Sequence, residues 1–221
     1  MVMADSTRRP GKKPAGGRGF LRAAHVQSAV PEDPETVAER LRERARRLRE
    51  RALAEHADGD ARVLDPQPVD PPPHARADGF PASVDEQLDR FPGVAGLVVV
   101  DDGRVLGVQQ GYRDGWTNPG GAQDPGEPLA ETAVRETREE TNIEAEVTGV
   151  LYARDFAVDY GGPEPVHVPL VVFTGRRVGG RRAAPLVRVS SGEPEIEDVQ
   201  WFDAGALPED FRDRELILDL L

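Results

Sequence analysis

The sequence predicts an α/β fold of the α+β type, in which a mixed β-sheet lies between helices and a helical extension precedes the domain. Three observations support this prediction. Strand-length apolar runs are interrupted by one helical segment and followed by another in the C-terminal part of the chain. A separate stretch near the N-terminus has a helical apolar repeat, and a proline-rich segment divides it from the rest.

The first segment, residues 1–33, is predicted to be a flexible basic tail. Its first 30 residues carry a net charge of +5 and are rich in glycine and arginine without periodicity. A nucleic-acid-binding arm is the alternative. A single short basic run favours the plain tail over that arm.

Residues 34–58 are predicted to form a helix. Pro34 suits a first helical turn, and apolar residues then recur at intervals of four and three. They are Val37, Leu41, Ala45, Leu48 and Ala52. Because this stripe is narrow, the helix could dock on the core, pair with a second copy as a short coiled coil, or stay exposed. A homodimer is therefore left open.

A proline-rich linker is predicted over residues 59–80, where the chain reads DPQPVDPPPHARADG from residue 65 to 79. It places a domain boundary near residue 80, with a folded domain over 81–221. The elements of that domain follow in order. Strands at 94–100 and 104–110 are joined by a DDG hairpin turn, and a helix covers 128–141. Further strands are expected at 145–153, 166–176, 186–189 and 199–202, before a last helix at 210–221.

Composition narrows the function classes. The absence of cysteine excludes disulfides and thiolate metal sites, and the four histidines have no zinc-ligand spacing. The apolar runs are much shorter than the roughly 20 residues that cross a bilayer, so we expect a soluble, cytoplasmic protein without membrane contact. Beyond residue 30 the net charge is −17. Such a body repels nucleic acid, and a polyanionic substrate would need a bridging cation.

Three carboxylates suggest where that cation binds. Glu136, Glu139 and Glu140 lie at i, i+3 and i+4, so a helix brings them to one side, where they repel unless they share a cation. Mg²⁺, or Mn²⁺ in its place, prefers such oxygen ligands. A solvated acidic helix face with Glu–Arg pairs is the alternative. The tight loop in front of the helix, which contains Gly120, Gly121 and Glu127, favours the metal site because it can supply backbone carbonyls.

This segment resembles the box of the Nudix hydrolase family. The matching positions are Gly121, Glu127, Arg135, Glu136, Glu139, Glu140 and Ile143. Two positions depart from the family pattern. Thr137 replaces an apolar residue, from which we expect looser packing behind the helix, and Asn142 replaces a glycine but still suits the left-handed end of a helix.

The resemblance extends over residues 92–221. GWTNPGG at 115–121 is similar to the family's lead-in to the box, with Asn118 in the place of a common leucine. IEDVQWFDAGALPED at 196–210 is similar to its final strand and the approach to the closing helix. The implied fold is an α/β/α sandwich.

The resemblance also implies roles. Glu136, Glu139, Glu140 and the Gly120 carbonyl would bind the metal, Arg135 would orient a helix glutamate, and Glu127 would pair with Arg135 outside the ligand shell. The implied activity is hydrolysis of a pyrophosphate linkage in a nucleotide derivative, such as a nucleoside triphosphate, ADP-ribose or a nucleotide sugar, by attack of metal-activated water on phosphorus. The alternative is a non-catalytic nucleotide-sensing module, against which the intact glutamate set argues.

Several assignments stay open. The candidates for the general base are Glu136, Glu164, Glu195 and Glu197. We expect Trp116 and Trp201 to pack in the core rather than stack on a base, and His167 to be a core histidine. Residues expected nearer the substrate side are Tyr112, Phe156 and Tyr160. The sequence assigns neither the substrate nor its binding residues.

Overall fold

The computed structural model describes residues 32–57, 59, 61–71, 78–111, 114–180 and 196–221. Pro31–Leu221 form one compact unit, distinct from Met1–Val30. The predicted basic tail therefore lies almost wholly outside the described residues. The strand predicted at 186–189 lies entirely outside them.

The described part of the chain contains four helices and nine strands. The helices are α1 (Pro34–His56), α3 (Val84–Arg90), α4 (Leu129–Thr141) and α5 (Arg214–Leu218). The strands are β1 (Arg62–Val63), β2 (Gln67–Val69), β3 (Val94–Asp101), β4 (Arg104–Gln110), β5 (Trp116–Thr117), β6 (Gly120–Ala122), β7 (Ile143–Val158), β8 (Val166–Gly180) and β9 (Ile196–Asp203).

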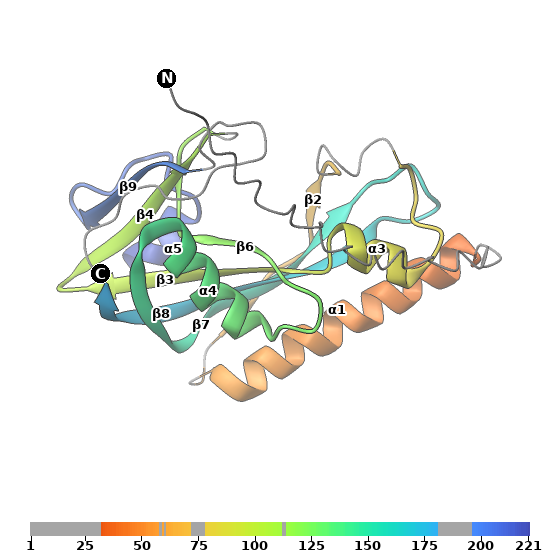
Figure 1. Cartoon of the computed structure of the whole chain (residues 1–221), viewed down its shortest axis with the longest axis horizontal. Helices are drawn as coiled ribbons and strands as arrows, with labels where there is room; N and C mark the ends of the chain where they lie inside the picture. The colour runs from red at the N-terminus through yellow and green to blue at the C-terminus, as the bar shows by residue number, and fades with distance from the viewer. Residues whose placement is uncertain (1–31, 58, 60, 72–77, 112–113, 181–195) are drawn as a thin grey trace, which may run out of the picture. The chain divides into compact units, whose positions relative to one another are not determined.

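These strands form one mixed sheet, as the sequence predicted (Figure 1). The order is β1-β7-β8-β3-β4-β5, and β2, β6 and β9 pair with β7, β3 and β4. β3 and β8 run parallel, whereas β7 and β8 form a long antiparallel hairpin. The mixed directions of these strands confirm the α+β class.

Apolar side chains pack on both faces of the sheet because successive strand residues point to opposite sides. In β3, Leu97 belongs to the cluster that contains Ala133 of α4 and Ala52 of α1. The next residue, Val98, belongs to the cluster that contains Ile217 of α5. Helices therefore cover the sheet on both sides, which confirms the predicted sandwich.

The N-terminal helix docks on this core, which decides among the three alternatives for its apolar stripe. Val37, Ala38 and Ala45 are fully buried, and α1 packs along β7 and β8. The segment that we predicted as a proline-rich linker contains β1 and β2, which pair in parallel with the edge of β7. An edge strand tolerates proline, because its outer N–H groups need no partner. The boundary that we predicted near residue 80 thus lies inside one compact unit.

Local signals explain most of the remaining elements. Asp102 and Gly103 both have positive φ and form the tight turn of the predicted β3–β4 hairpin. Asn142 ends α4 in the left-handed conformation, as expected. Thr137 does not loosen the packing, since its side chain is fully buried and its hydroxyl donates to the Ala133 carbonyl. None of the described helices is long and apolar enough to cross a membrane.

Two helices differ from the prediction. α5 is shorter than expected, because Asp213 takes a left-handed conformation directly before it and Tyr152 donates a hydrogen bond to the Asp213 carboxylate over 2.5 Å. We did not predict α3. Its signal was a Ser-x-x-Glu capping pattern, in which Ser83 accepts from the Glu86 N–H over 3.1 Å.

Candidate active site

The glycine loop lies against the sheet through the pairing of β6 with β3. Glycine is required at both positions because neighbouring atoms leave no room for a Cβ. A Cβ on Gly120 would lie 2.5 Å from the Ala95 carbonyl oxygen, and a Cβ on Gly121 would lie 2.5 Å from the carboxyl carbon of Glu136. The sequence uses glycine here so that the helix carboxylate can reach the loop backbone.

Two carboxylates of α4 meet this backbone. Glu140 is 3% exposed, and its carboxylate accepts a hydrogen bond from the Gly120 N–H over 2.8 Å. The Glu136 carboxylate lies against Gly121. Glu136 and Glu140 therefore flank the same two residues of backbone, as their spacing of four on a helix allows.

Arg135 connects the loop to the helix. Its Nε and Nη2 each donate to Glu127 over 2.9 Å, and its Nη1 donates to Glu136 over 2.7 Å and to Glu139 over 3.2 Å. The Glu127 carboxylate also accepts from the Thr132 hydroxyl over 2.7 Å. The hydrogen bonds from Arg135 lower the pKa of Glu127 to about 2, and those to Glu127 raise the pKa of Arg135. Both groups stay charged at neutral pH.

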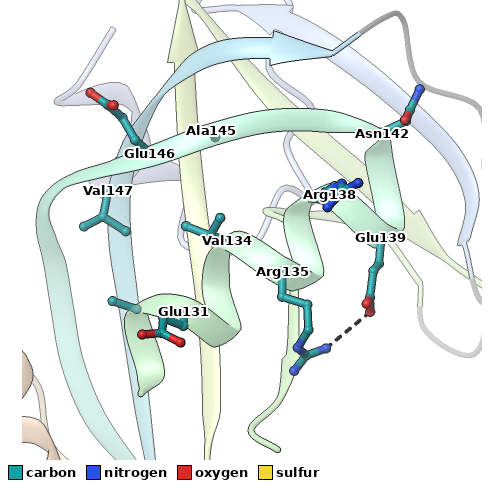
Figure 2. Close-up of a pocket in the computed structure, with 10 residues that line it drawn as sticks. Glu131, Val134, Arg135, Arg138, Glu139, Asn142, Ala145, Glu146 and Val147 are labelled. Atoms are coloured by element: carbon teal, nitrogen blue, oxygen red, sulfur yellow. Dashed lines mark hydrogen bonds and ion pairs between the residues drawn. The ribbon is translucent and has the colours of Figure 1, made fainter. Parts of the chain in front are cut away.

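Glu139 lies at the outer edge of this group. Its side chain is 53% exposed and points toward Arg135 (Figure 2). On the same side of α4 a groove of about 1170 Å³ runs between the helix and the start of β7. Ala130, Val134 and Val147 contribute its apolar part.

The donor set fits a hard divalent cation. Glu136, Glu140 and the Gly120 carbonyl offer oxygen ligands around one stretch of backbone. Among the described residues, however, no three acidic or histidine side chains already converge closely enough to hold an ion. Glu136 and Glu139 both accept from Nη1 of Arg135. Participation of Glu139 would require it to exchange this partner.

A small cavity of about 140 Å³ lies beside the same loop, and Gly120 and Gly121 form part of its wall. Its polar lining comes from three separate segments: Gln110, Thr117, Asn118 and Arg212. Phe156, expected on the substrate side, lines it as well. Sequence reasoning noted Asn118 only as a departure from a motif and missed the other three, which share no local pattern.

The other candidates lie elsewhere or outside the described residues. Glu164 pairs with Arg42 of α1, and Glu197 is exposed on β9. Tyr112 and Glu195 fall outside the part of the chain that the structure describes. Tyr160 is buried, and burial raises its pKa.

Trp116 and Trp201 are partly buried and pack against the core rather than within it, and His167 is largely buried. Trp116 meets Phe202 edge to face at 4.8 Å, and the Arg104 guanidinium lies 5.9 Å from the Trp201 ring centre. Nδ1 of His167 is 2.9 Å from the Asp155 carboxylate, which makes it a partnered, largely buried histidine.

Comparisons with known proteins identify the family to which this chain is similar. The NUDIX domain model matches residues 89–220. An RNA pyrophosphohydrolase of Erythrobacter litoralis is 28% identical over 140 residues, which cover 57% of this chain and 84% of that protein. The nucleoside diphosphate-linked moiety X motif 6 protein of Xenopus laevis is 46% identical over 65 residues, which span only 28% of this chain and 30% of the relative.

The crystal structure of a MutT NUDIX hydrolase from Burkholderia pseudomallei is 27% identical, with a TM-score of 0.43, over 58% of this chain and 95% of that one. The structure of a UDP-X diphosphatase is 17% identical, with a TM-score of 0.44, over 86% and 95%. The family assignment rests on the domain model, which matches more than half of the chain.

Proposed function

The chain belongs to the Nudix family, and from that premise we propose that it is a divalent-metal-dependent hydrolase of the pyrophosphate linkage in a nucleotide derivative. One observation carries the proposal. The Glu136 and Glu140 carboxylates flank the Gly120–Gly121 backbone, and the same backbone forms a wall of the cavity beside it. A cation-binding edge and a space for part of a substrate therefore share one loop.

The chain's own residues would position the reacting groups. Arg135 fixes the Glu136 carboxylate from one side while Gly121 leaves room for it on the other. Glu127 in turn holds Arg135 with two parallel hydrogen bonds, the arrangement that best fixes a guanidinium. A divalent ion bound there would offset phosphate charge and lower the pKa of a water molecule. Rigid placement of these carboxylates is thus the protein's main contribution.

The cavity supports a nucleotide-derived substrate. Gln110, Thr117 and Asn118 offer amide and hydroxyl groups, which suit hydrogen bonding to a base or a sugar, and Arg212 offers a charge that suits a phosphate. The Erythrobacter relative is named for the hydrolysis of a pyrophosphate linkage in RNA. We propose the broader class of nucleoside triphosphates, ADP-ribose and nucleotide sugars as substrates of this chain.

A substrate panel tests the proposal. Nucleoside triphosphates, ADP-ribose and nucleotide sugars are incubated with Mg²⁺, with Mn²⁺ or with EDTA, and the products are separated by ion-exchange chromatography. We expect cleavage between two phosphorus atoms in at least one class, abolished by EDTA. Binding without cleavage under every metal condition would replace the hydrolase with a nucleotide-sensing module.

A further inference from the structure

The N-terminal helix contacts the catalytic loop, although it lies outside the part of the chain that the family model matches. Arg44 of α1 makes this contact. Its Nη1 donates to the Pro92 carbonyl over 2.6 Å, and its Nη2 donates to the side-chain oxygen of Gln123 over 3.4 Å. One guanidinium therefore bridges the residues just before β3 and just after β6.

Gln123 connects Arg44 to the segment that matches the Nudix box. Its N–H donates to the Gly93 carbonyl over 2.9 Å, and its side-chain amide donates to the Glu127 carbonyl. Gln123 is only 6% exposed. Since Glu127 holds Arg135, a continuous series of polar contacts runs from α1 to the carboxylates of α4.

Leu48 and Ala52 of α1 belong to the same apolar cluster as Leu129, which follows the loop, but a cavity also lies between α1 and the loop. A cavity of about 180 Å³ separates the helix from the loop, with Leu48 and Ala52 on one side and Gly126 and Pro128 on the other. Apolar packing is thus interrupted beneath the loop, and packing that is missing cannot fix its position. The hydrogen bonds of Arg44 therefore contribute more to holding the loop in position.

We propose that Arg44 is a positioning residue of the active site, which holds the loop over residues 123–127 through Gln123 so that Glu127 and Arg135 present the metal-binding carboxylates. The inference rests on the proposed function for its catalytic consequence. Partners one layer outside a metal site change metal affinity by about 10- to 100-fold when they are removed. Arg44 acts through Gln123, Glu127 and Arg135. Its removal is therefore expected to have an effect at or below the low end of this range, about threefold to tenfold.

A purely structural role for Arg44 makes a different prediction. If Arg44 only docked α1, its loss would resemble the loss of Arg49, which lies on the same helix and pairs with Asp155 of β7 over 2.8 Å. Arg49→Met is therefore the matched control. It weakens the docking of α1 without touching the loop.

The first arm is amide hydrogen–deuterium exchange on the full-length, metal-free protein, so it is independent of activity. In Arg44→Met we expect exchange in the peptide over residues 120–128 to be faster by about an order of magnitude. In Arg49→Met that peptide should keep the wild-type rate. Wild-type exchange in Arg44→Met, or equal acceleration in both variants, would overturn the proposal.

The second arm measures the Mg²⁺ concentration for half-maximal activity on whichever substrate the panel identifies. Arg44→Met should raise it by about threefold to tenfold. Arg44→Lys, which reaches one acceptor and not both, should raise it less, and Arg49→Met should leave it unchanged. Gln123→Met should add little to Arg44→Met, because both break one series of contacts. Full additivity of the two would contradict the route through Gln123.

The exchange and Mg²⁺ measurements distinguish failure of the positioning role from failure of the proposed hydrolase function. An inactive protein with selective loop exchange in Arg44→Met would reject the hydrolase and keep the positioning role. If Arg44→Met does not fold, Arg44→Lys and Gln123→Met carry the exchange test with the same expectations.

Discussion

Two arginine-centred clusters of the described residues, one in the box and one between α1 and β7, differ in charge balance. In the first, the box cluster, Arg135 contacts three glutamates, Glu127, Glu136 and Glu139, at 3.2 Å or less. Their side chains are 16%, 18% and 53% exposed. Three carboxylates thus share one guanidinium in this cluster.

The second, the anchor cluster, is Arg49 with Asp155 and His167. The Nε of Arg49 lies 2.8 Å from the Asp155 carboxylate, as an ion pair that is not aligned for a hydrogen bond. Asp155 is 3% exposed and also contacts His167 over 2.9 Å. One cation balances one carboxylate, and little room is left for water.

The difference in charge balance distinguishes a cluster that stabilises the fold from a cluster that can bind a cation. A buried cluster whose charges balance needs no further cation and links α1 to β7. A cluster in which three carboxylates share one guanidinium can take up a further cation. We therefore propose that the anchor cluster contributes stability and that the box cluster, together with Glu140, binds the metal. Changes in each should affect different observables.

The largest effect is expected for Glu140→Gln. An amide oxygen can still accept from the Gly120 N–H, so the fold should persist, but the negative charge is lost. We expect turnover to fall by about 100- to 1,000-fold, measured as kcat at saturating Mg²⁺, with an unchanged circular dichroism spectrum. Turnover within threefold of wild type would remove Glu140 from the metal site.

Asp155→Asn should show the opposite pattern to Glu140→Gln: lower stability with nearly unchanged turnover. It leaves the Arg49 charge without its carboxylate in a largely buried place, which costs about 3 kcal/mol of unfolding free energy. Urea denaturation measures the loss, and kcat at saturating Mg²⁺ should stay within about twofold. A variant with full stability and lost activity would reverse our assignment of the two clusters.

Glu127→Gln is expected to have a smaller effect on activity. It removes the charge that Arg135 pairs with but leaves the carboxylates of α4 in place. The metal concentration for half-maximal activity should rise about tenfold. An unchanged metal requirement would show that Arg135 holds Glu136 without help from the loop.

The smallest effect concerns pH. The pKa of Glu127 is lowered to about 2 from an ordinary value of 4.5, so its ion pair contributes stability above about pH 4.5, which is lost as pH falls toward 2. Partial exposure limits this to on the order of 1 kcal/mol. In metal-free protein, the stability difference between wild type and Glu127→Gln should shrink between pH 5 and pH 2.5. A constant difference would mean that this carboxylate is not held by charge.

The two clusters also show what a sequence can predict. The box cluster lies within a short stretch, so helix spacing alone brings Arg135, Glu136 and Glu139 together. The Arg49–Asp155 pair joins residues far apart in the chain, and no local pattern shows that α1 crosses β7. The same holds for Arg212, which reaches the cavity only because the C-terminal segment folds back along β5.

Short strands were missed for a related reason. Pro68 lies in β2, and proline ordinarily argues against a strand. Only the free edge of β7, formed by residues much later in the chain, makes this segment extended and paired. The strong local signals, such as Asp102–Gly103 and the left-handed Asn142, were in contrast sufficient to place a turn and a helix end.

The most direct test of the central claim is Mn²⁺ binding followed by electron paramagnetic resonance, on wild type, on Glu136→Gln/Glu140→Gln and on Asp155→Asn. We expect wild type and Asp155→Asn to bind the ion alike and the double variant to lose that binding. Equal binding by all three proteins would contradict the assignment of the box cluster as the metal site.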